Sequence, residues 1–209
     1  MTLLVGATAV ACTSQPSPPP PPPVNPPPTV LNLGVASSAF PIIQLSAASK
    51  MLENHQVRLH FVATSSSTLF DDLNDGLLDA ILVHHIPEGN GRYFNPIALD
   101  GLVIITHPDN PVNALTSAEV QAIFNGRITN WQAVGGADQP IELFSREEGS
   151  GLRTLLRQRI MAEQRISPNA RLQTDDEAML TAVANNPTAI GFSSMASASQ
   201  TPSIKMLQL

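Results

Sequence analysis

The residues best suited to bind an anion lie between Ser145 and Arg153, in the order Ser-Arg-Glu-Glu-Gly-Ser-Gly-Leu-Arg. Arg146 offers a planar fork of donors that matches the oxygens of a tetrahedral anion. Gly149 and Gly151 flank a serine, and glycines let a backbone approach a ligand closely. These residue types in this order predict an oxyanion-binding site.

The elements around this stretch are expected to position it. An apolar run at 141–144 predicts a strand that leads in, and apolar residues spaced from Leu152 to Met161 predict a helix that leads out. The first N–H groups of a helix have no backbone partners, and the helix dipole adds positive charge there. A strand, a glycine-containing turn and a helix therefore form a natural anion site.

The preceding segment, residues 30–99, alternates strand and helix patterns. Strands are expected at 30–36, 57–62 and 78–83, with helices between them, and this alternation predicts a parallel sheet flanked by helices. In such sheets ligands bind beyond the carboxyl ends of the strands. The three strand ends carry Ser37 and Ser38, Ser65 and Ser66, and His84 and His85, which we expect to line one crevice. Turn formation and helix capping are the alternative roles of these serines.

The later segment continues the α/β pattern. A buried strand is expected at 99–106, and further strands at 189–192 and 204–207. Two capping boxes, Thr116 to Glu119 and Thr174 to Glu177, predict helix starts. Trp131 is expected to pack in a turn.

Composition excludes several functions. The net charge of −6 argues against nucleic-acid binding, which needs a basic face. A single cysteine, Cys12, excludes an internal disulfide, and neither a metal site nor a cofactor is expected. The Gly-Ser-Gly loop lacks the Gly-Lys-Ser/Thr of nucleotide-binding loops, and no base is placed beside Ser150, so we do not expect an enzyme.

The first 29 residues carry no charged side chain and are expected to lie outside the core. Residues 1–12 are apolar and end in Ala-Val-Ala-Cys, which resembles a bacterial lipobox and predicts a secretory leader with lipidation at Cys12. No basic residue precedes Cys12, unlike in usual leaders. Residues 13–29 hold ten prolines and predict an extended linker, in which the stretch from Pro16 to Pro28 would reach roughly 40 Å at ~3.1 Å per residue. The alternative is a disordered low-complexity tail.

Four motifs, in order, resemble the phosphate-binding proteins of ABC importers. They are residues 34–41 (GVASSAFP), 113–131 with NALT and IFNGRITNW, 146–151 (REEGSG) and 189–193 (AIGFS). The resemblance covers roughly residues 30–209. It implies a two-lobed α/β fold of the periplasmic-binding-protein type, with an anion between two mostly parallel sheets flanked by helices. Lobe I would comprise 30–99 plus 189–209, and lobe II 100–188.

The resemblance also implies a set of ligand contacts. Arg146 would clamp the anion and Glu148 would hold its guanidinium. Further contacts would come from the opening loop, the second and third strand ends and the helix start: Ser38, Ala39, Phe40 (through its N–H), Ser65 or Ser66, His84, Ser150, Gly151 and Leu152. The protein would be an extracytoplasmic, membrane-anchored monomer in the periplasm or on the outer cell surface, delivering phosphate or a related oxyanion to a transporter permease.

Three positions depart from the family pattern. Ala39 and Leu152 replace residues with hydroxyls, and His84 stands where the family has an aspartate that accepts the proton of bound phosphate. An imidazole does not repel a fully ionised anion as a carboxylate does, so sulfate or arsenate would be better tolerated and binding would depend on pH. The alternative is a degenerate member that acts as a sensor or cell-surface interaction domain.

Overall fold

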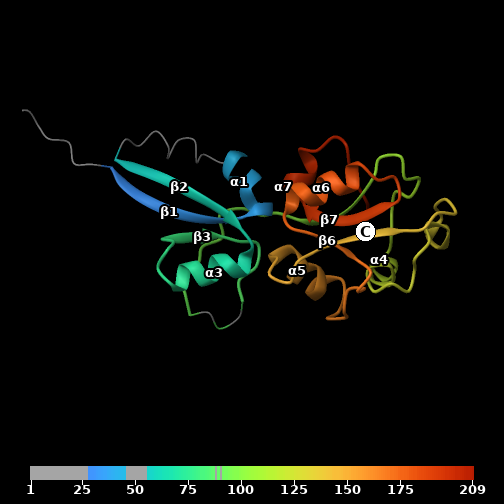
Figure 1. The fold of residues 1–209 in the computed structure, drawn as a ribbon, viewed down its shortest axis with the longest axis horizontal. Coiled ribbons are helices and arrows are strands. Elements are labelled where there is room, and N and C mark those ends of the chain that lie inside the picture. Colours follow the sequence, from blue (N-terminus) through green and yellow to red (C-terminus); the bar gives the residue numbers. More distant parts are fainter. Residues whose placement is uncertain (1–27, 46–55, 88, 90) are drawn as a thin grey trace, which may run out of the picture.

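A computed structural model of the chain describes residues 28–45, 56–87, 89 and 91–209. It shows two α/β lobes side by side along the long axis of the molecule (Figure 1). The predicted leader, Cys12 and nearly all of the proline-rich linker lie outside the described residues. So does the second half of the helix predicted after Pro41.

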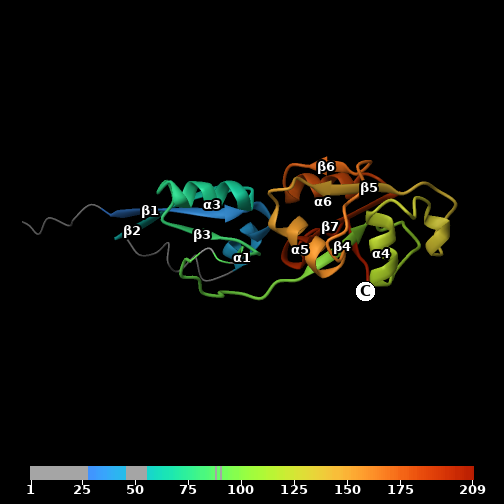
Figure 2. The ribbon, with the colours of Figure 1, turned by 90° about the horizontal axis from the view of Figure 1, so that it is seen from below.

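The first lobe contains a three-stranded sheet in the order β2-β1-β3, and every pairing is parallel. This confirms the predicted strand and helix alternation. Helix α3 lies on one face of the sheet and α1 lies toward the other (Figure 2). The elements in chain order are β1 (Thr29–Ala36), the 3₁₀ turn η1 (Ser37–Ala39), α1 (Phe40–Leu45), β2 (Val57–Thr64), α3 (Ser66–Asn74) and β3 (Ala80–Leu82).

Gly34 in β1 is required by close packing rather than by an unusual backbone angle. A Cβ atom added there would lie 2.5 Å from a methyl of Leu69 and 2.6 Å from one of Leu78, both of which are buried. The described core of this lobe has five buried hydrophobic residues, and these two leucines are among them. The small core therefore has little room for an added methyl group.

We expect Gly34→Ala to lower the free energy of unfolding by about 1–3 kcal/mol, the usual cost of overpacking a core. Chemical denaturation of the full chain would measure it. Gly101→Ala is the matched control, because the three atoms nearest to its added Cβ all belong to the flexible Met195 side chain, at 3.0 Å and beyond. Equal effects of the two substitutions would contradict the packing explanation.

The second lobe is built on a five-stranded mixed sheet in the order β6-β5-β7-β4-β8. Strand β5 pairs in parallel with β6 and β7, whereas β4 runs antiparallel to β7 and β8. Its elements are β4 (Leu102–Thr106), α4 (Ser117–Phe124), η2 (Trp131–Val134), β5 (Glu142–Arg146), α5 (Gly151–Arg159), β6 (Arg171–Gln173), α6 (Asp176–Ala184), β7 (Ala189–Ser194), α7 (Met195–Ser199) and β8 (Lys205–Met206).

The position of β7 differs from the sequence expectation. We expected residues 189–209 to return to lobe I, but β7 pairs with β4 and β5 in the second lobe, and β8 pairs with β4. All six residues of β7 are buried. Their apolar run would suit the centre of either sheet, so the sequence pattern did not distinguish the two lobes. Within the described residues, the chain crosses between the lobes through the segment that precedes β4 (Figure 1).

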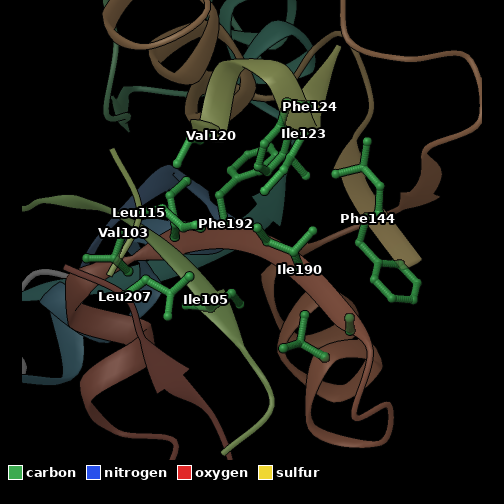
Figure 3. Close-up of a cluster of buried hydrophobic side chains, with 14 of the residues drawn as sticks. Val103, Ile105, Leu115, Val120, Ile123, Phe124, Phe144, Ile190, Phe192 and Leu207 are labelled. Atoms are coloured by element: carbon green, nitrogen blue, oxygen red, sulfur yellow. The ribbon is translucent and has the colours of Figure 1, made fainter. Parts of the chain in front are cut away.

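The core of the second lobe is large and continuous (Figure 3). Phe124 of α4 and Phe192 of β7 pack with ring centroids 5.8 Å apart, and both are fully buried. Trp131, 2% exposed, starts η2 and donates its indole N–H to the carbonyl of Thr188 at 2.9 Å, so its predicted role in a packed turn is confirmed. The loop after β5, which contains the residues expected to bind an anion, is therefore supported by a large packed core.

The two predicted capping boxes have different outcomes. Thr116 and Glu119 form a complete capping box at the start of α4. At α6 the N-cap is Asp175, one residue later than predicted, and its carboxylate accepts from the N–H of Ala178 at 2.8 Å. Asp176 therefore becomes the first helical residue and lies buried. None of the helices in the described part of the chain is long and apolar enough to cross a membrane.

Candidate functional site

The carboxyl ends of β1, β2 and β3 meet at the edge of the first lobe that faces the second lobe (Figure 1). Ser38 follows β1 and His84 follows β3, and the Ser38 hydroxyl lies 3.2 Å from Nδ1 of His84. Nε2 of His84 lies 3.1 Å from the Asp100 carboxylate, which also accepts from the N–H groups of Gly101 and Ala196. This buried chain of hydrogen bonds links the first lobe to the second.

Helix α3 begins at the same edge, with Ser65 as its N-cap. The Ser65 hydroxyl accepts from the N–H of Thr68 and lies 3.0 Å from the hydroxyls of Ser67 and Thr68. Ser66, the next residue, is 7% exposed and its Oγ has no hydrogen-bond partner among the described residues. A buried hydroxyl without a partner is costly unless a ligand or water satisfies it. Of the two serines that the sequence left open, Ser66 is therefore the one with a free hydroxyl.

Helix α5 begins at the facing edge of the second lobe. Ser150 is its N-cap and accepts from the N–H of Arg153 at 3.4 Å. Gly151 and Leu152 open the helix, and the Leu152 side chain is buried in the hydrophobic core. Leucine at this position therefore serves packing, and its contribution to a ligand would come from its backbone N–H.

Arg146, at the end of β5, is 2% exposed. Its guanidinium donates to the Glu147 carboxylate at 3.2 Å, to the Ser37 hydroxyl at 3.3 Å and to the Thr174 carbonyl at 3.3 Å. The bond to Ser37 joins the two lobes directly. The junction therefore contains a buried charged donor whose ion-pair partner is the Glu147 carboxylate.

The acidic partner of Arg146 differs from the one that we expected. Glu147 holds the guanidinium, whereas Glu148 has an 89% exposed side chain and pairs with Arg153 at 3.4 Å. Both glutamates follow β5 within two residues, and the sequence pattern did not reveal which would turn inward. The expected role of Glu148 beside Arg146 is therefore wrong in this structure.

The opening loop also differs in detail from the expectation. The Ala39 side chain is buried and brings no polar group. The N–H of Phe40 donates to the Ser37 carbonyl, so this donor already has a partner, and the Phe40 ring packs edge-on against Phe61. Ser37 contacts Arg146, and Ser38 contacts His84.

A second buried carboxylate, Asp176, lies beside Arg146. Its Oδ1 is 3.8 Å from the guanidinium NH1, and the Ser193 hydroxyl donates to it at 3.1–3.2 Å. Burial raises the pKa of Asp176 above its ordinary value of 3.8, although hydrogen bonds from Ser197 and Ser193 and the Arg146 charge act in the opposite direction. Asp176 therefore binds a proton more readily than an exposed aspartate.

The two lobes touch where the starts of α3 and α5 meet. The N–H of Ser67 donates to the Gly149 carbonyl at 3.2 Å. A Cβ added to Gly149 would lie 2.1 Å from the Ser67 hydroxyl, and one added to Gly151 would lie 2.8 Å from the Ser66 hydroxyl. Glycine at both positions permits this approach, which brings two helix N-termini and Arg146 to one junction.

Sequence reasoning missed several polar residues of this junction: Asp100, Glu147, Thr174, Asp176, Ser193 and Ser197. Asp100 is a charged residue beside the apolar strand β4, and this position is the one signal that could have identified it. Asp176 was hidden inside the shifted capping motif. Among the described residues, no group of three or more histidines, cysteines or acidic residues could hold a metal ion.

Two α/β lobes with polar groups gathered at their junction define a class of bilobal binding proteins. A model of the PBP superfamily domain matches residues 22–206, and the chain belongs to this superfamily. The predicted bilobal α/β fold of the periplasmic-binding-protein type is thereby confirmed.

Curated relatives include phosphate-binding proteins named PstS. The one from Bacillus subtilis is 29% identical over 134 residues, which cover 56% of this chain and 41% of the relative. The one from Pseudomonas aeruginosa is 28% identical over 126 residues, covering 54% and 38%. The chain thus spans less than half the length of these curated relatives.

Two solved structures are similar over most of this chain. The "Putative Phosphate ABC Transporter Substrate-Binding Protein with Bound Phosphate from Clostridium perfringens" has a TM-score of 0.78 and 27% identity, covering 86% of this chain and 75% of that one. An ABC-type phosphate transport receptor from Vibrio cholerae has a TM-score of 0.63 and 28% identity, covering 84% and 75%.

Proposed function

We propose that this protein captures phosphate or a related tetrahedral oxyanion outside the cytoplasm and delivers it to an ABC importer. The observation that carries the proposal is the meeting of buried Arg146 with the N-termini of α3 and α5. Helix N-termini and a buried guanidinium favour the same ligand, an anion with several oxygens. The names of the similar proteins, which refer to phosphate binding and transport, support this choice of ligand.

The proposal also covers membrane attachment, oligomeric state and the absence of catalytic activity. Lipidation of Cys12 would anchor it, and residues 13–29 would hold the two lobes away from the membrane. We propose that it acts as a monomer with a permease partner and without catalytic activity. Ser38, His84 and Asp100 are linked in the order of a catalytic triad, but Ser38 is 5% exposed, so its hydroxyl is shielded from a substrate.

Thermal denaturation and calorimetry with phosphate, sulfate, arsenate, molybdate and acetate would test the proposal. We expect the tetrahedral anions to stabilise the full chain, by about 2.7 kcal/mol at a hundred times Kd. Sulfate should compete with phosphate, because His84 stands where the family resemblance places the carboxylate that would repel it. Absence of stabilisation by every tetrahedral anion would overturn the proposal.

A second candidate, a sensor or cell-surface interaction domain, is favoured by one observation. The Arg146 guanidinium already has protein partners in Ser37, Glu147 and Thr174. If these contacts persist in solution, the junction is a fixed lobe contact and not a ligand site. The same titration distinguishes the candidates, because a fixed contact predicts no response to any oxyanion.

The ionisation of Asp176 should affect both anion affinity and stability. Because its pKa is raised in the folded chain, the contribution of Asp176 to the free energy of unfolding is highest below pH 3.8 and is lost as the pH rises through the folded pKa. The ionised carboxylate also repels an anion bound by Arg146. Sulfate, which stays a dianion throughout, should therefore bind more weakly as the pH rises across this window.

Asp176→Asn is expected to remove this repulsion and raise sulfate affinity at pH 8 about tenfold, which corresponds to about 1.4 kcal/mol. The free energy of unfolding of Asp176→Asn minus that of the unsubstituted chain should increase as the pH rises from 3.8 through the folded pKa of Asp176. Above that pKa the difference should stay constant. Calorimetry and urea unfolding at several pH values would measure both effects. Equal sulfate affinities of the two proteins at pH 8 would show that Asp176 does not face the anion.

A further inference from the structure

A cavity of about 760 Å³ lies between the lobes, next to Arg146. Pockets for small organic ligands occupy about 300–1,000 Å³, whereas a single water accounts for about 30 Å³ in the liquid. A tetrahedral anion of five heavy atoms would leave most of this space empty. The lining comprises Ser37, Phe40, Ala63, Thr64 and Ser65 from the first lobe, and Glu147, Leu172, Gln173, Thr174, Asp175 and Glu177 from the second.

The cavity is continuous with the proposed anion site. One guanidinium nitrogen of Arg146 donates both to the Ser37 hydroxyl and to the Thr174 carbonyl, and these two residues line the cavity on opposite lobes. An oxyanion that replaced either contact would sit at the inner end of the cavity. Any substituent on that anion would point into the remaining space.

The charge of the lining is negative, with three carboxylates and no lysine or arginine. Glu147 is paired with Arg146, and Asp175 accepts hydrogen bonds from the Ala178 N–H and the Thr174 hydroxyl. Glu177 is exposed and has no hydrogen bond or ion pair within the described part of the chain. Glu177 and the rest of the Asp175 charge therefore remain available to a cation. Phe40 and Leu172 give the same cavity an apolar wall.

We propose that the ligand is an oxyanion with a short cationic arm, such as an aminoalkyl phosphonate or an amino-substituted phosphate monoester. This inference rests on the proposed function. The oxyanion binds at Arg146, the carbon linker lies along Phe40 and Leu172, and the ammonium group lies near Asp175 and Glu177. An arm without charge gains the apolar contact alone, and inorganic phosphate gains neither.

Calorimetry of the full chain with three probes would test this inference. They are inorganic phosphate, 2-aminoethylphosphonate and propylphosphonate, which matches the amino compound in length but has no ammonium group. We expect 2-aminoethylphosphonate to bind at least fivefold more tightly than propylphosphonate at low salt. The preference should shrink at high salt, because partly exposed charges are screened.

A double substitution of the two acidic residues tests where the cationic arm lies. Glu177→Gln combined with Asp175→Asn, which retains a capping side chain, should lower the preference for 2-aminoethylphosphonate over propylphosphonate three- to fivefold, and phosphate affinity should not fall, because the substitutions remove negative charge. Asp71→Asn, an exposed change on α3, is the matched control and should alter neither.

The outcomes separate this inference from the proposed function. If phosphate binds but the amino and propyl compounds bind equally, the cationic arm is wrong and the oxyanion site stands. If the double substitution leaves the preference for 2-aminoethylphosphonate over propylphosphonate unchanged, the placement of the ammonium group near Asp175 and Glu177 is wrong. If no probe binds, the proposed function fails, and the inference fails with it.

Discussion

Arg146→Lys should lower oxyanion affinity at least about a hundredfold, and Arg146→Gln should abolish measurable binding. Lysine keeps the charge but loses the fork that can bind two oxygens at once, and a hydrogen bond to a charged group contributes about 1.5–3 kcal/mol. The surroundings are prepared for a guanidinium, because the Glu147 carboxylate, the Ser37 hydroxyl and the Thr174 carbonyl accept three of its hydrogen bonds. These bonds come from two different guanidinium nitrogens, Nε and Nη2, so the single nitrogen of a lysine would not reach all three part-buried acceptors.

Calorimetry with phosphate and sulfate would measure the effect, together with circular dichroism to verify folding. Arg159→Lys is the matched control, since Arg159 is exposed at the end of α5 and has no partner within the described residues. If Arg146→Lys folds and binds within threefold of the unsubstituted chain, Arg146 is not the anion clamp.

Local sequence patterns were sufficient to predict most of the secondary structure. Strand periodicity predicted β1, β2 and β5, and the Thr116 capping box predicted the start of α4 correctly. These features depend on neighbours within a few residues, which a sequence displays directly. The short strand β6 was missed, because its three residues, Arg171 to Gln173, show no apolar run.

Long-range choices could not be read from the sequence in the same way. Strand β7 suits any buried position, and its place between β5 and β4 depends on the whole second lobe. The choice between Glu147 and Glu148 as partner of Arg146 depends on how the loop after β5 turns. Resemblance to a family predicted the class of site, whereas Asp100 and Asp176 became visible when distant segments were brought together.

Gly149→Ala should weaken oxyanion binding about tenfold or more by keeping the lobes apart. The added Cβ would lie 2.1 Å from the Ser67 hydroxyl and 3.2 Å from the Ser65 hydroxyl. The Gly149 backbone is not in the left-handed region, so alanine itself is tolerated there. Rotation of the Ser67 hydroxyl would still leave the Ser65 hydroxyl and the Ser67 Cβ at 3.2 Å. We therefore expect the loop before α5 to move away from α3, which would break the bond from the Ser67 N–H to the Gly149 carbonyl. The two helix N-termini would then no longer converge on one anion.

A second substitution in the facing lobe identifies the cause. Ser67→Ala removes the hydroxyl nearest the added Cβ, and Ser67→Gly also removes the Ser67 Cβ, which lies 3.2 Å from it. Affinity should therefore recover partly in Gly149→Ala with Ser67→Ala and more fully with Ser67→Gly.

Small-angle scattering should show a larger radius of gyration for Gly149→Ala alone in the presence of anion. If Gly149→Ala binds normally, the Ser67 hydroxyl rotates away and lobe contact at this point does not limit binding. If binding is lost and neither Ser67 substitution restores it, the defect lies within the loop that contains Gly149. Comparing the single and double substitutions detects coupling between the two residues, and none would then be present.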